Sequence, residues 1–576
     1  MSDYMKTYQE WLEDPFFDEK TREELKAIAE DEKEIEDRFY DTLHFGTAGL
    51  RGILGAGTNR MNIYTVGAAT QGLANYIKKQ GGQERGVAIA YDCRHMSPEF
   101  AEEAGLVLAA NGIRAYVFDS LRPTPELSFA VRHLGCIAGI NVTASHNPAA
   151  YNGYKVYWED GAQITPPHDT GIMDEVAAIT SYHDIQTMDR QKAEDEGLFR
   201  VIGAEVDEAY DACIEALILD REAIARQADE LTIVFTPLHG TGNVPVRRIL
   251  KKLGFNRVLV VPEQELPDGD FPTAPYPNPE TEQAFEMALA LGKKERADIL
   301  LATDPDADRL GVYVSDGKGG YHPLTGNMSG CLMEEYLLAQ RKQRGLLPED
   351  GFVVSTIVST NLAAAIAGAY DMDFMEVLTG FKYIGEKILI SEQTGHGHYQ
   401  FGFEESYGSL AAGYARDKDA VGAAVILCEM AAHYRDQGKT LWDAMLAIYE
   451  RYGWYREEVI SISHEGVEGL EKIARTMSEL RSDPPKEIGG SSVLAVRDYQ
   501  AGIRRDTVTG TEEAVDLPSS NVLYYELEEG AWACVRPSGT EPKIQVYYGV
   551  RAASEKDLCQ VTKKIGEAVR KIVEKA

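Results

Sequence analysis

The chain has 576 residues, a hydrophobic fraction of 44% and a charged fraction of 26%, which are ordinary for a globular protein and argue against disorder or a fibrous class. Domains usually hold on the order of 100 to 200 residues, so three or four domains are expected. Asp and Glu total 92 against 58 Lys and Arg, for a formal charge of -34. That charge repels nucleic acids and anionic membranes, so neither is expected as a partner. A small anionic substrate stays compatible, because salt screens charges beyond roughly 8 Å.

The cysteines and the N-terminus point to a reducing compartment. The seven cysteines are scattered and include no CxxC pair of the kind used by zinc and redox sites, so buried free thiols are expected. The N-terminal segment MSDYMKTYQEWLEDPFFDEK is acidic and has no apolar stretch, which argues against a secretory signal. Both features fit the cytoplasm. No heptad or exposed apolar repeat indicates an interface, so the sequence leaves the oligomeric state open.

The first elements in chain order are a helical extension and a βαβ unit. Residues 1–40 include KTREELKAIAEDEKEIEDRF, in which apolar residues recur at helical spacing. From Arg85 the pattern becomes a strand, GVAIAYD, followed by Ser97 and Pro98 as a helix cap and first helical position. The helix is expected to end near Gly112, before a second strand, IRAYVFD.

The same alternation of strand and helix returns twice more. It occurs at LTIVFTP, NVPVRRILKKLG and RVLVVPE, and again at GFVVSTIV and NLAAAIAGAY, which predicts three α/β domains in series. The last stretch has strand-like segments such as NVLYYEL and KIQVYYGV before a terminal helix, which indicates a smaller α+β domain. The predicted boundaries are 1–40 for the extension and 41–205, 206–323, 324–455 and 456–576 for the four domains.

An uncharged run from Gly351 to Tyr370 is about as long as a membrane-spanning helix, roughly 20 residues. Polar residues between Ser355 and Asn361 divide it into a β-rich part and an Ala-rich helical part with a capping signal between them. We therefore predict a strand followed by a helix within a soluble domain.

The first chemical motif is NVTASHNPAAYNGYK, residues 141–155, directly after the apolar run CIAGI. A strand that delivers Ser145 to a turn exposes its hydroxyl, as a nucleophile or phosphate carrier requires. By local chemistry alone, the segment could equally be an Asn-Pro turn in which Ser145 and His146 act as caps. This segment alone does not decide between a phosphate carrier and a turn, so the other motifs of the chain must be considered with it.

The second motif is DPDADR, residues 304–309, which follows the apolar strand ADILLAT. Carboxylates at alternate positions of a tight loop can converge on one hard divalent cation. A calcium EF-hand has the same spacing, but its required glycine is replaced by Arg309 and its terminal glutamate by Ser315. A solvated acidic turn is less favoured, because three neighbouring carboxylates repel one another without a cation.

Three further loops carry weaker signals. In FEESYG, residues 403–408, a glutamate and a serine can hydrogen-bond sugar hydroxyls, and FGTAGLRG, residues 45–52, offers an arginine from a glycine-rich turn. RPSGTEPK, residues 536–543, can cradle a phosphate or be a surface turn. Walker, GxGxxG, HExxH and GxSxG motifs are absent from the sequence, so nucleotide, nicotinamide and metalloprotease functions lose their main support.

Taken together, these motifs resemble the α-D-phosphohexomutase superfamily, and within it the phosphoglucomutase-like branch that includes phosphopentomutase relatives. The resemblance runs from Phe45 to Tyr548 and takes in FGTAGLRG, RPTPEL, TASHNPAAYNGYK, FTPLHGTG, DPDADR, LTGFKYIG, FEESYGS and RPSGTEPK in the family's order. It implies four domains around one cleft, three of α/β type and a C-terminal one of α+β type, each supplying one loop.

The resemblance also implies roles for the residues that match its motifs. Ser145 is similar to the phosphoserine of the family. The implied Mg²⁺ ligands are Ser145, Asp304, Asp306 and Asp308. The groups implied around the reacting end are Arg51, His146, Lys155 and Arg309. The residues implied to bind the sugar and its far phosphate are Thr379, Gly380, Lys382, Glu404, Ser406, Lys418, Arg536, Ser538, Gly539 and Thr540.

The choice of base, one departure from the family's motifs and one further lysine complete what the resemblance implies. Lys155 is preferred as the base over His146, because neighbouring cations can lower the pKa of a lysine. Some branches of the family end the sugar loop with Gly-His, whereas Tyr407 and Gly408 stand here, so a histidine acid is missing. Lys418 lies in RDKD, which resembles a family segment but could also be a charged surface turn.

The reaction implied is that of α-phosphoglucomutase, which interconverts glucose 1-phosphate and glucose 6-phosphate through glucose 1,6-bisphosphate and needs Mg²⁺. Phosphopentomutase, phosphomannomutase and sugar-bisphosphate synthase are the nearest alternatives. A non-catalytic sugar-phosphate sensor is an alternative of another class, which the retained serine and complete aspartate triad disfavour.

Overall fold

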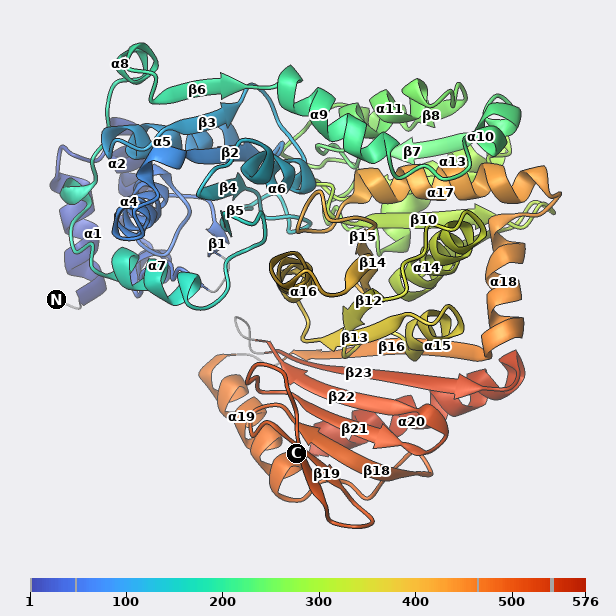
Figure 1. Cartoon of the computed structure of the whole chain (residues 1–576). Helices are drawn as coiled ribbons and strands as arrows, with labels where there is room; N and C mark the ends of the chain where they lie inside the picture. The colour runs from blue at the N-terminus through green and yellow to red at the C-terminus, as the bar shows by residue number, and fades with distance from the viewer. Residues whose placement is uncertain (1–2, 47–48, 464–465, 539–542, 576) are drawn as a thin grey trace. The chain divides into compact units, whose positions relative to one another are not determined.

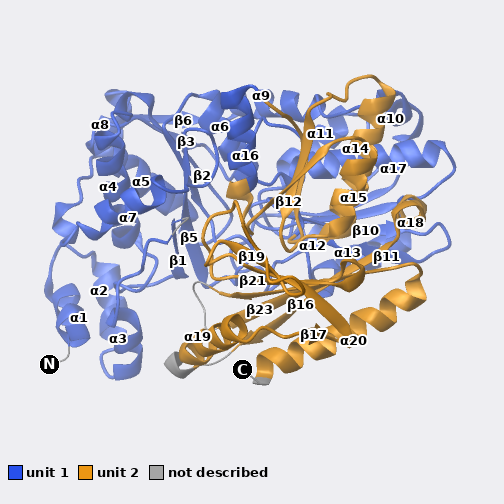
Figure 2. Cartoon of the chain, turned by 60° about the horizontal axis from the view of Figure 1, so that its bottom comes forward, with its two compact units in different colours: residues 1–325, 384–395, 407–441 blue, residues 326–383, 396–406, 442–576 orange. Residues whose placement is uncertain are grey.

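The computed structural model in Figure 1 describes residues 3–46, 49–463, 466–538 and 543–575. The chain divides into two compact units, coloured in Figure 2. Unit 1 comprises residues 1–325, 384–395 and 407–441, and unit 2 comprises residues 326–383, 396–406 and 442–576. Each unit is described below by itself.

Unit 1 begins with three helices, α1 (Asp3–Glu13), α2 (Glu19–Ala27) and α3 (Glu32–Phe39). The α2 and α3 helices begin where a preceding aspartate accepts a hydrogen bond from a backbone N–H of the first turn. An aromatic core holds the three helices together and packs them against the next helix, α4 (Ile63–Lys79). Trp11 is at its centre, stacked on Phe17 at 4.1 Å and edge-on to Tyr64 of α4 at 5.5 Å.

The first sheet of unit 1 has the order β1-β5-β4-β2-β3-β6. Its strands are β1 (Gly49–Ile53), β2 (Val87–Tyr91), β3 (Ala115–Phe118), β4 (Ala138–Val142), β5 (Tyr151–Trp158) and β6 (Phe199–Ile202). The helices that follow α4 are α5 (Ser97–Ala110), α6 (Thr124–His133), α7 (His168–Ala177) and α8 (Arg190–Asp195). Helix α5 begins at Ser97, with Met96 as its cap and Pro98 as its second residue, so the prediction of Ser97 as the cap is wrong by one residue. The strands β2, β3, β4 and β6 run parallel. Helix α5 packs on all four and α6 on β2 and β4, so β2, β3 and β4 are largely buried, whereas the two central residues of β6 are exposed.

The second sheet of unit 1 has the order β11-β10-β9-β7-β8. Its strands are β7 (Ile233–Thr236), β8 (Val258–Val260), β9 (Ile299–Thr303), β10 (Leu310–Ser315) and β11 (Tyr321–Leu324). The other elements of this part are α9 (Ala204–Glu215), α10 (Arg221–Gln227), α11 (Asn243–Lys252), α12 (Pro262–Glu265), α13 (Glu282–Glu295), β15 (Gly408–Leu410) and α17 (Ala420–Asp436). All five residues of β9 are buried, and β10 returns antiparallel to it, so the residues between them form a tight connection at the end of a buried strand.

Unit 2 begins with a third set of α/β elements. They are α14 (Gly326–Gln343), β12 (Gly351–Thr356), α15 (Asn361–Ala369), β13 (Asp373–Val377) and β14 (His398–Glu404), followed by α18 (Leu441–Tyr452). Helix α16 (Phe381–Thr394) begins in this unit, but its residues from Ile384 onward belong to unit 1. Strand β12 pairs parallel with both β13 and β14. The strand-then-helix prediction for the uncharged run is confirmed, because β12 is followed by α15 with Thr360 as its cap. In the described part of the chain, no helix is both long and apolar enough to cross a membrane.

The C-terminal part of unit 2 is an antiparallel sheet of order β16-β23-β22-β21-β18-β19-β20, with β17 paired to β18. Its strands are β16 (Trp454–Ser463), β17 (Glu487–Ile488), β18 (Ser491–Asp498), β19 (Ile503–Asp506), β20 (Glu512–Ala514), β21 (Leu523–Leu527), β22 (Trp532–Pro537) and β23 (Lys543–Ala552). The helices α19 (Gly466–Ser482) and α20 (Glu555–Lys575) contribute apolar side chains to its core. The predicted α/β class with a C-terminal α+β part is confirmed.

The prediction of buried thiols is wrong for part of the set. All seven cysteines are free, but Cys559 is exposed and Cys93 and Cys213 are half-buried. Cys559 lies on the amphipathic terminal helix, where only the face toward the sheet is covered. Residue type alone does not say which helical face a cysteine occupies.

We predict that Trp11→Ala releases the N-terminal helices from unit 1. The side chain is 2% exposed and fills the centre of the aromatic core, so its loss should weaken the docking by about 3–5 kcal/mol. Hydrogen exchange of the α1–α3 amides measures this effect directly. Tyr40→Ala is the matched control, because Tyr40 is 62% exposed beside the same helices. Unchanged protection in the Trp11 variant would show that the core does not hold the extension.

Candidate active site

Ser145 lies in the connection between β4 and β5, close to the end of a buried strand. Its φ of 51° is in the left-handed region, which is uncommon for a residue other than glycine. The Ser145 backbone N–H donates to Oγ1 of Thr143 at 2.9 Å, and Thr143 donates in turn to Asp92 at 2.6 Å. Gly153 of β5 lies so close that a Cβ there would be 2.5 Å from the Thr143 carbonyl oxygen. The loop is therefore held in one defined conformation.

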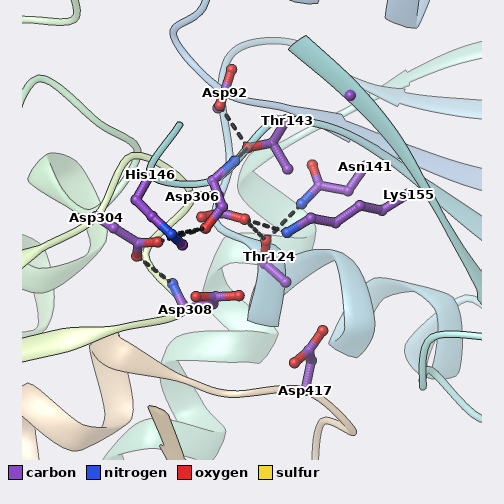
Figure 3. Close-up of polar contacts among 12 residues, drawn as sticks. Asp92, Thr124, Asn141, Thr143, His146, Lys155, Asp304, Asp306, Asp308 and Asp417 are labelled. Atoms are coloured by element: carbon purple, nitrogen blue, oxygen red, sulfur yellow. Dashed lines mark hydrogen bonds and ion pairs between the residues drawn. The ribbon is translucent and has the colours of Figure 1, made fainter. Parts of the chain in front are cut away.

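The three aspartates lie in the connection between β9 and β10 and are buried (Figure 3). Each offers a carboxylate oxygen within 4.8 Å of the others. Oδ1 of Asp304 accepts the backbone N–H groups of Asp308 and Arg309 at 3.1 and 3.0 Å. The Ser145 hydroxyl donates to the other oxygen of Asp304 at 2.9 Å. The structure thus brings together two motifs that are 159 residues apart in the sequence.

The charge on the triad is distributed unevenly. Burial, together with the charges of Asp306 and Asp308, raises the pKa of Asp304 well above its usual value. Burial alone would raise the pKa of Asp306 too, but the charge and hydrogen bond of Lys155 outweigh it and lower that pKa. Among the described residues, Oδ1 of Asp306 and Oδ1 of Asp308 have no hydrogen-bond partner although they are buried. Buried carboxylate oxygens without donors fit a hard divalent cation.

Lys155 lies on β5, opposite Asn141 of β4. Its ammonium group donates to Oδ2 of Asp306 at 2.8 Å. The argument that neighbouring cations lower the pKa of Lys155 is wrong, because burial lowers it but the charges of Asp306 and Asp308 more than offset burial and raise it. The sequence could not reveal this sign, because the aspartates come from a different sheet.

Thr124 and Asn141 are site residues that the sequence motifs did not single out. The hydroxyl group of Thr124 donates to Asp306 at 2.9 Å and accepts from the Asn141 side chain at 2.7 Å. The backbone N–H of Thr124 donates to the Asp306 carbonyl at 2.9 Å, so the first turn of α6 touches the aspartate loop twice. The sequence offered one signal for Thr124, because it lies in the RPTPEL motif that matches the family. In the structure it is the first residue of α6.

His146 and Arg309 flank the serine and the triad. The imidazole Nδ1 of His146 is 3.3 Å from the Ser145 hydroxyl, and its ring packs edge-on against Tyr276. Burial first, and then the charge of Arg309, lower the pKa of His146 to about 2. Arg309 forms an ion pair with Glu280. His146 is therefore neutral in this environment.

Arg51 is the remaining cation predicted for the reacting end, and Lys418 is predicted to bind substrate phosphate. Arg51 is on β1, opposite Gly153, and its side chain is exposed. The ammonium group of Lys418 is 3.2 Å from Asp308 and 3.0 Å from Asp417. The alternative of a charged surface turn is wrong for Lys418, because its side chain is 10% exposed.

The predicted sugar-binding residues lie in unit 2. The backbone N–H of Gly380, whose φ is 123°, donates to Glu404 at 2.7 Å, so the two loops are in contact. Thr379 and Ser406 are half-buried, and the Lys382 ammonium lies 5.5 Å from the centre of the Tyr383 ring. Glu405, which sequence reasoning passed over, accepts from Thr356 at 2.9 Å and Ser359 at 3.1 Å at the end of β12.

The predicted phosphate cradle also lies in unit 2. Arg536 is half-buried on β22, opposite Gln545 of β23. The backbone N–H of Ser538 donates to the Lys543 carbonyl at 2.7 Å, so the residue after β22 is paired with the first residue of β23. The other two predicted cradle residues, Gly539 and Thr540, lie outside the described residues.

Comparison with protein families finds three successive matches. The chain matches the α/β/α domains I, II and III of phosphoglucomutase/phosphomannomutase over residues 42–183, 208–318 and 325–452. A phosphoglucomutase of Staphylococcus epidermidis is 39% identical over 514 residues, which cover 88% of this chain and 90% of the relative. A phosphoglucomutase of Staphylococcus aureus is 37% identical over 539 residues, which cover 93% of this chain and 95% of the relative.

Solved structures show the same fold. A putative phosphomannomutase from Thermus thermophilus is 22% identical, covers 93% of this chain and 99% of its own, and superposes with a TM-score of 0.68. The phosphoglucomutase parafusin from Paramecium is 17% identical, covers 93% of this chain and 95% of its own, and superposes with a TM-score of 0.69. The domain matches and the staphylococcal relatives together show that the chain belongs to the phosphoglucomutase/phosphomannomutase family of the α-D-phosphohexomutase superfamily, whose members are isomerases.

Proposed function

We propose that this protein is an α-phosphoglucomutase that interconverts glucose 1-phosphate and glucose 6-phosphate by way of glucose 1,6-bisphosphate. The observation that carries the proposal is the 2.9 Å hydrogen bond between the Ser145 hydroxyl and Asp304. This hydrogen bond places a candidate phosphoryl carrier beside three buried carboxylates. The staphylococcal relatives, 39% and 37% identical, are named phosphoglucomutase, which favours glucose phosphates over mannose or pentose phosphates.

In the proposed reaction, phosphorylated Ser145 is the donor. The P–O bond to its Oγ breaks as a sugar hydroxyl oxygen bonds to phosphorus, which leaves free serine and the bisphosphate. The proton of the sugar hydroxyl passes to Lys155 in its neutral form or to His146, the ionisable groups beside the triad and the serine, and from there to Oγ, so no other proton donor is needed. In the second half-reaction the other phosphoryl group returns to Oγ and the product monophosphate leaves.

The triad and the serine are proposed to hold Mg²⁺ through Ser145, Asp304, Asp306 and Asp308. When bound, Mg²⁺ neutralises carboxylate charge and polarises the transferring phosphoryl group. The hydrogen-bonded backbone N–H groups and the ammonium of Lys155 keep the carboxylates in place. Arg309 and Arg51 add positive charge beside the serine, where a phosphoserine would carry about -1.5 to -2 charges.

Binding of the rest of the substrate is assigned to loops of unit 2. We assign the sugar hydroxyls to Glu404 and Ser406, supported by the contact of Glu404 with the Gly380 backbone. Thr379 and Lys382 are assigned to sugar specificity, and Lys418 of unit 1 to the phosphate. The non-reacting phosphate is assigned to the cradle residues, which are Arg536, Ser538, Gly539 and Thr540.

We also propose a cytoplasmic location, which the seven free thiols support. The predicted division into four domains near residues 205, 323 and 455 is part of the proposal, with each domain supplying one loop. Turnover of glucose 1-phosphate and ribose 1-phosphate, assayed side by side with glucose 1,6-bisphosphate present, tests the substrate. Faster turnover of ribose 1-phosphate would favour phosphopentomutase, and binding without turnover would favour a sensor.

The first prediction concerns the phosphoryl carrier. The resting enzyme should carry phosphate on Ser145, because the cycle needs a donor, and Ser145→Ala should abolish turnover while sugar-phosphate binding remains measurable. Intact-mass analysis and peptide mapping locate the phosphate. Ser120→Ala is the control, because Ser120 is exposed on the same unit and should leave activity unchanged. Phosphate found only at another residue in active enzyme would refute the assignment.

The second prediction concerns the metal. Asp306→Asn removes a carboxylate oxygen that has no hydrogen-bond donor among the described residues, so it should weaken cation binding. Activity should fall by at least about 100-fold, and the Mg²⁺ concentration for half-maximal activity should rise. Magnesium titrations measure both effects. Asp316→Asn, in a turn of the same sheet, should leave the Mg²⁺ requirement unchanged. An unaltered requirement in the Asp306 variant would count against this loop.

The third prediction concerns the remote phosphate. A guanidinium group binds phosphate through paired hydrogen bonds that an ammonium group cannot reproduce, so Arg536→Lys should weaken binding of both monophosphates. The value of kcat/KM should fall about 10-fold or more in both directions, with little change in Mg²⁺ affinity. Arg551→Lys, on the neighbouring strand β23, is the control. A loss in only one direction would mean that Arg536 is not a shared anchor.

A further inference from the structure

Arg94 is a fully buried arginine in the connection after β2. It binds the backbone of the serine loop, residues 143–150, which contains Ser145. One terminal nitrogen donates to the carbonyl oxygens of Pro148 and Tyr151 at 2.9 and 3.0 Å. The other donates to the carbonyl oxygens of Ser145 and Asn147 at 2.5 Å each. All four hydrogens of the terminal nitrogens thus have acceptors in the loop or at the first residue of β5 that follows it.

The serine loop needs such a partner. Residues 143–150 belong to no helix or strand, so most of their carbonyl groups have no partner in a β-ladder or helix. Ser145 itself adopts a left-handed conformation, with φ of 51°, which a residue with a side chain keeps only when its surroundings enforce it. Because Arg94 binds the carbonyl group of Ser145, it acts on the dihedral angles that aim the hydroxyl.

Arg94 is itself held from two sides. Its Nε is 3.2 Å from Asp92, and Asp92 also accepts from the hydroxyl of Thr143 in the serine loop at 2.6 Å. On the other side, the ring of Phe271 lies 5.0 Å from the guanidinium carbon. Phe271 is fully buried and belongs to the segment between α12 and α13. The neighbouring pair of His95 and Asp270, 2.7 Å apart, fastens this segment to the chain next to Arg94.

We propose that Arg94 is a positioning residue that aims the Ser145 hydroxyl for phosphoryl transfer by fixing the backbone of its loop, with Phe271 and Asp92 holding the guanidinium in place. The proposal rests on the proposed role of Ser145 as phosphoryl carrier. Arg94 does not touch the hydroxyl, so its removal affects the rate of transfer through geometry. Because the substrate-binding loops lie elsewhere in the chain, the affinity for sugar phosphate is left nearly unchanged.

The substitution Arg94→Lys provides the sharpest test. Lysine keeps the positive charge beside Asp92, but its single nitrogen has three donors and cannot span two pairs of carbonyl groups. In a single turnover from glucose 1,6-bisphosphate to Ser145, Arg94→Lys should slow transfer by about 10- to 100-fold. Steady-state kcat should fall in parallel, and KM should stay within about threefold of the wild type.

Arg60→Lys is the matched control for the loss of a buried arginine. Arg60 is 5% exposed and donates to the carbonyl groups of Asp37 and Asn59 at 3.3 and 3.1 Å, in the N-terminal part of the same unit. Its variant should lose a similar amount of thermal stability and keep a transfer rate within about twofold of the wild type. A transfer rate in Arg94→Lys that is no slower than in Arg60→Lys would overturn the proposal.

Phe271→Leu is a second variant in case Arg94→Lys fails to fold. It keeps every donor of Arg94 and removes only the aromatic face, so transfer should slow by about threefold to tenfold with KM unchanged. A wild-type rate in this variant would overturn the proposal. If wild-type enzyme transfers phosphate to Ser145 and both variants match it, only the role of Arg94 fails. If wild-type enzyme never phosphorylates Ser145, the proposed function fails with it.

Discussion

Three aspartate carboxylates are buried together at the end of one strand, and the surrounding residues are arranged to compensate them. A buried carboxylate is costly unless it is paired or hydrogen-bonded. Asp304 accepts hydrogen bonds from two backbone N–H groups and from the serine hydroxyl. Asp306 forms an ion pair with Lys155, and Asp308 forms one with Lys418. Two of the groups that make these contacts, the Ser145 hydroxyl and the Lys155 ammonium group, are also the candidates for phosphoryl and proton transfer. Two carboxylate oxygens that have no donor among the described residues are where a cation fits.

Strand ends explain how these groups meet. The strands β4 and β9 are buried along their whole length, and their charged and catalytic candidates follow at the end of each strand. In open α/β sheets such connections form the usual place for a binding site. The serine follows β4 and the triad follows β9. The formal charge of -34 does not exclude an anionic substrate here, because Lys155, Arg309 and Lys418 supply local positive charge.

Local patterning was enough to predict much of the fold and the centre of the site. Apolar runs followed by turn residues placed Ser145 and the aspartates at strand ends, and both placements are confirmed. The cap and composition of the run from Gly351 to Tyr370 separated a strand from a helix, as observed. These features depend on neighbours in the chain, since strand burial and helix capping act over a few residues.

The sequence by itself therefore determined the fold class, the family and the candidate site residues, because each is written in short contiguous motifs. Only the tertiary structure decided which groups touch them. Thr124 meets Asp306 across 182 positions, and Arg94 meets the Ser145 loop across 51. It also decided the sign of the pKa shift of Lys155, because that sign depends on whether carboxylates or cations surround the ammonium group. These contacts join residues that are far apart in the sequence, so a pattern of neighbouring residues cannot predict them.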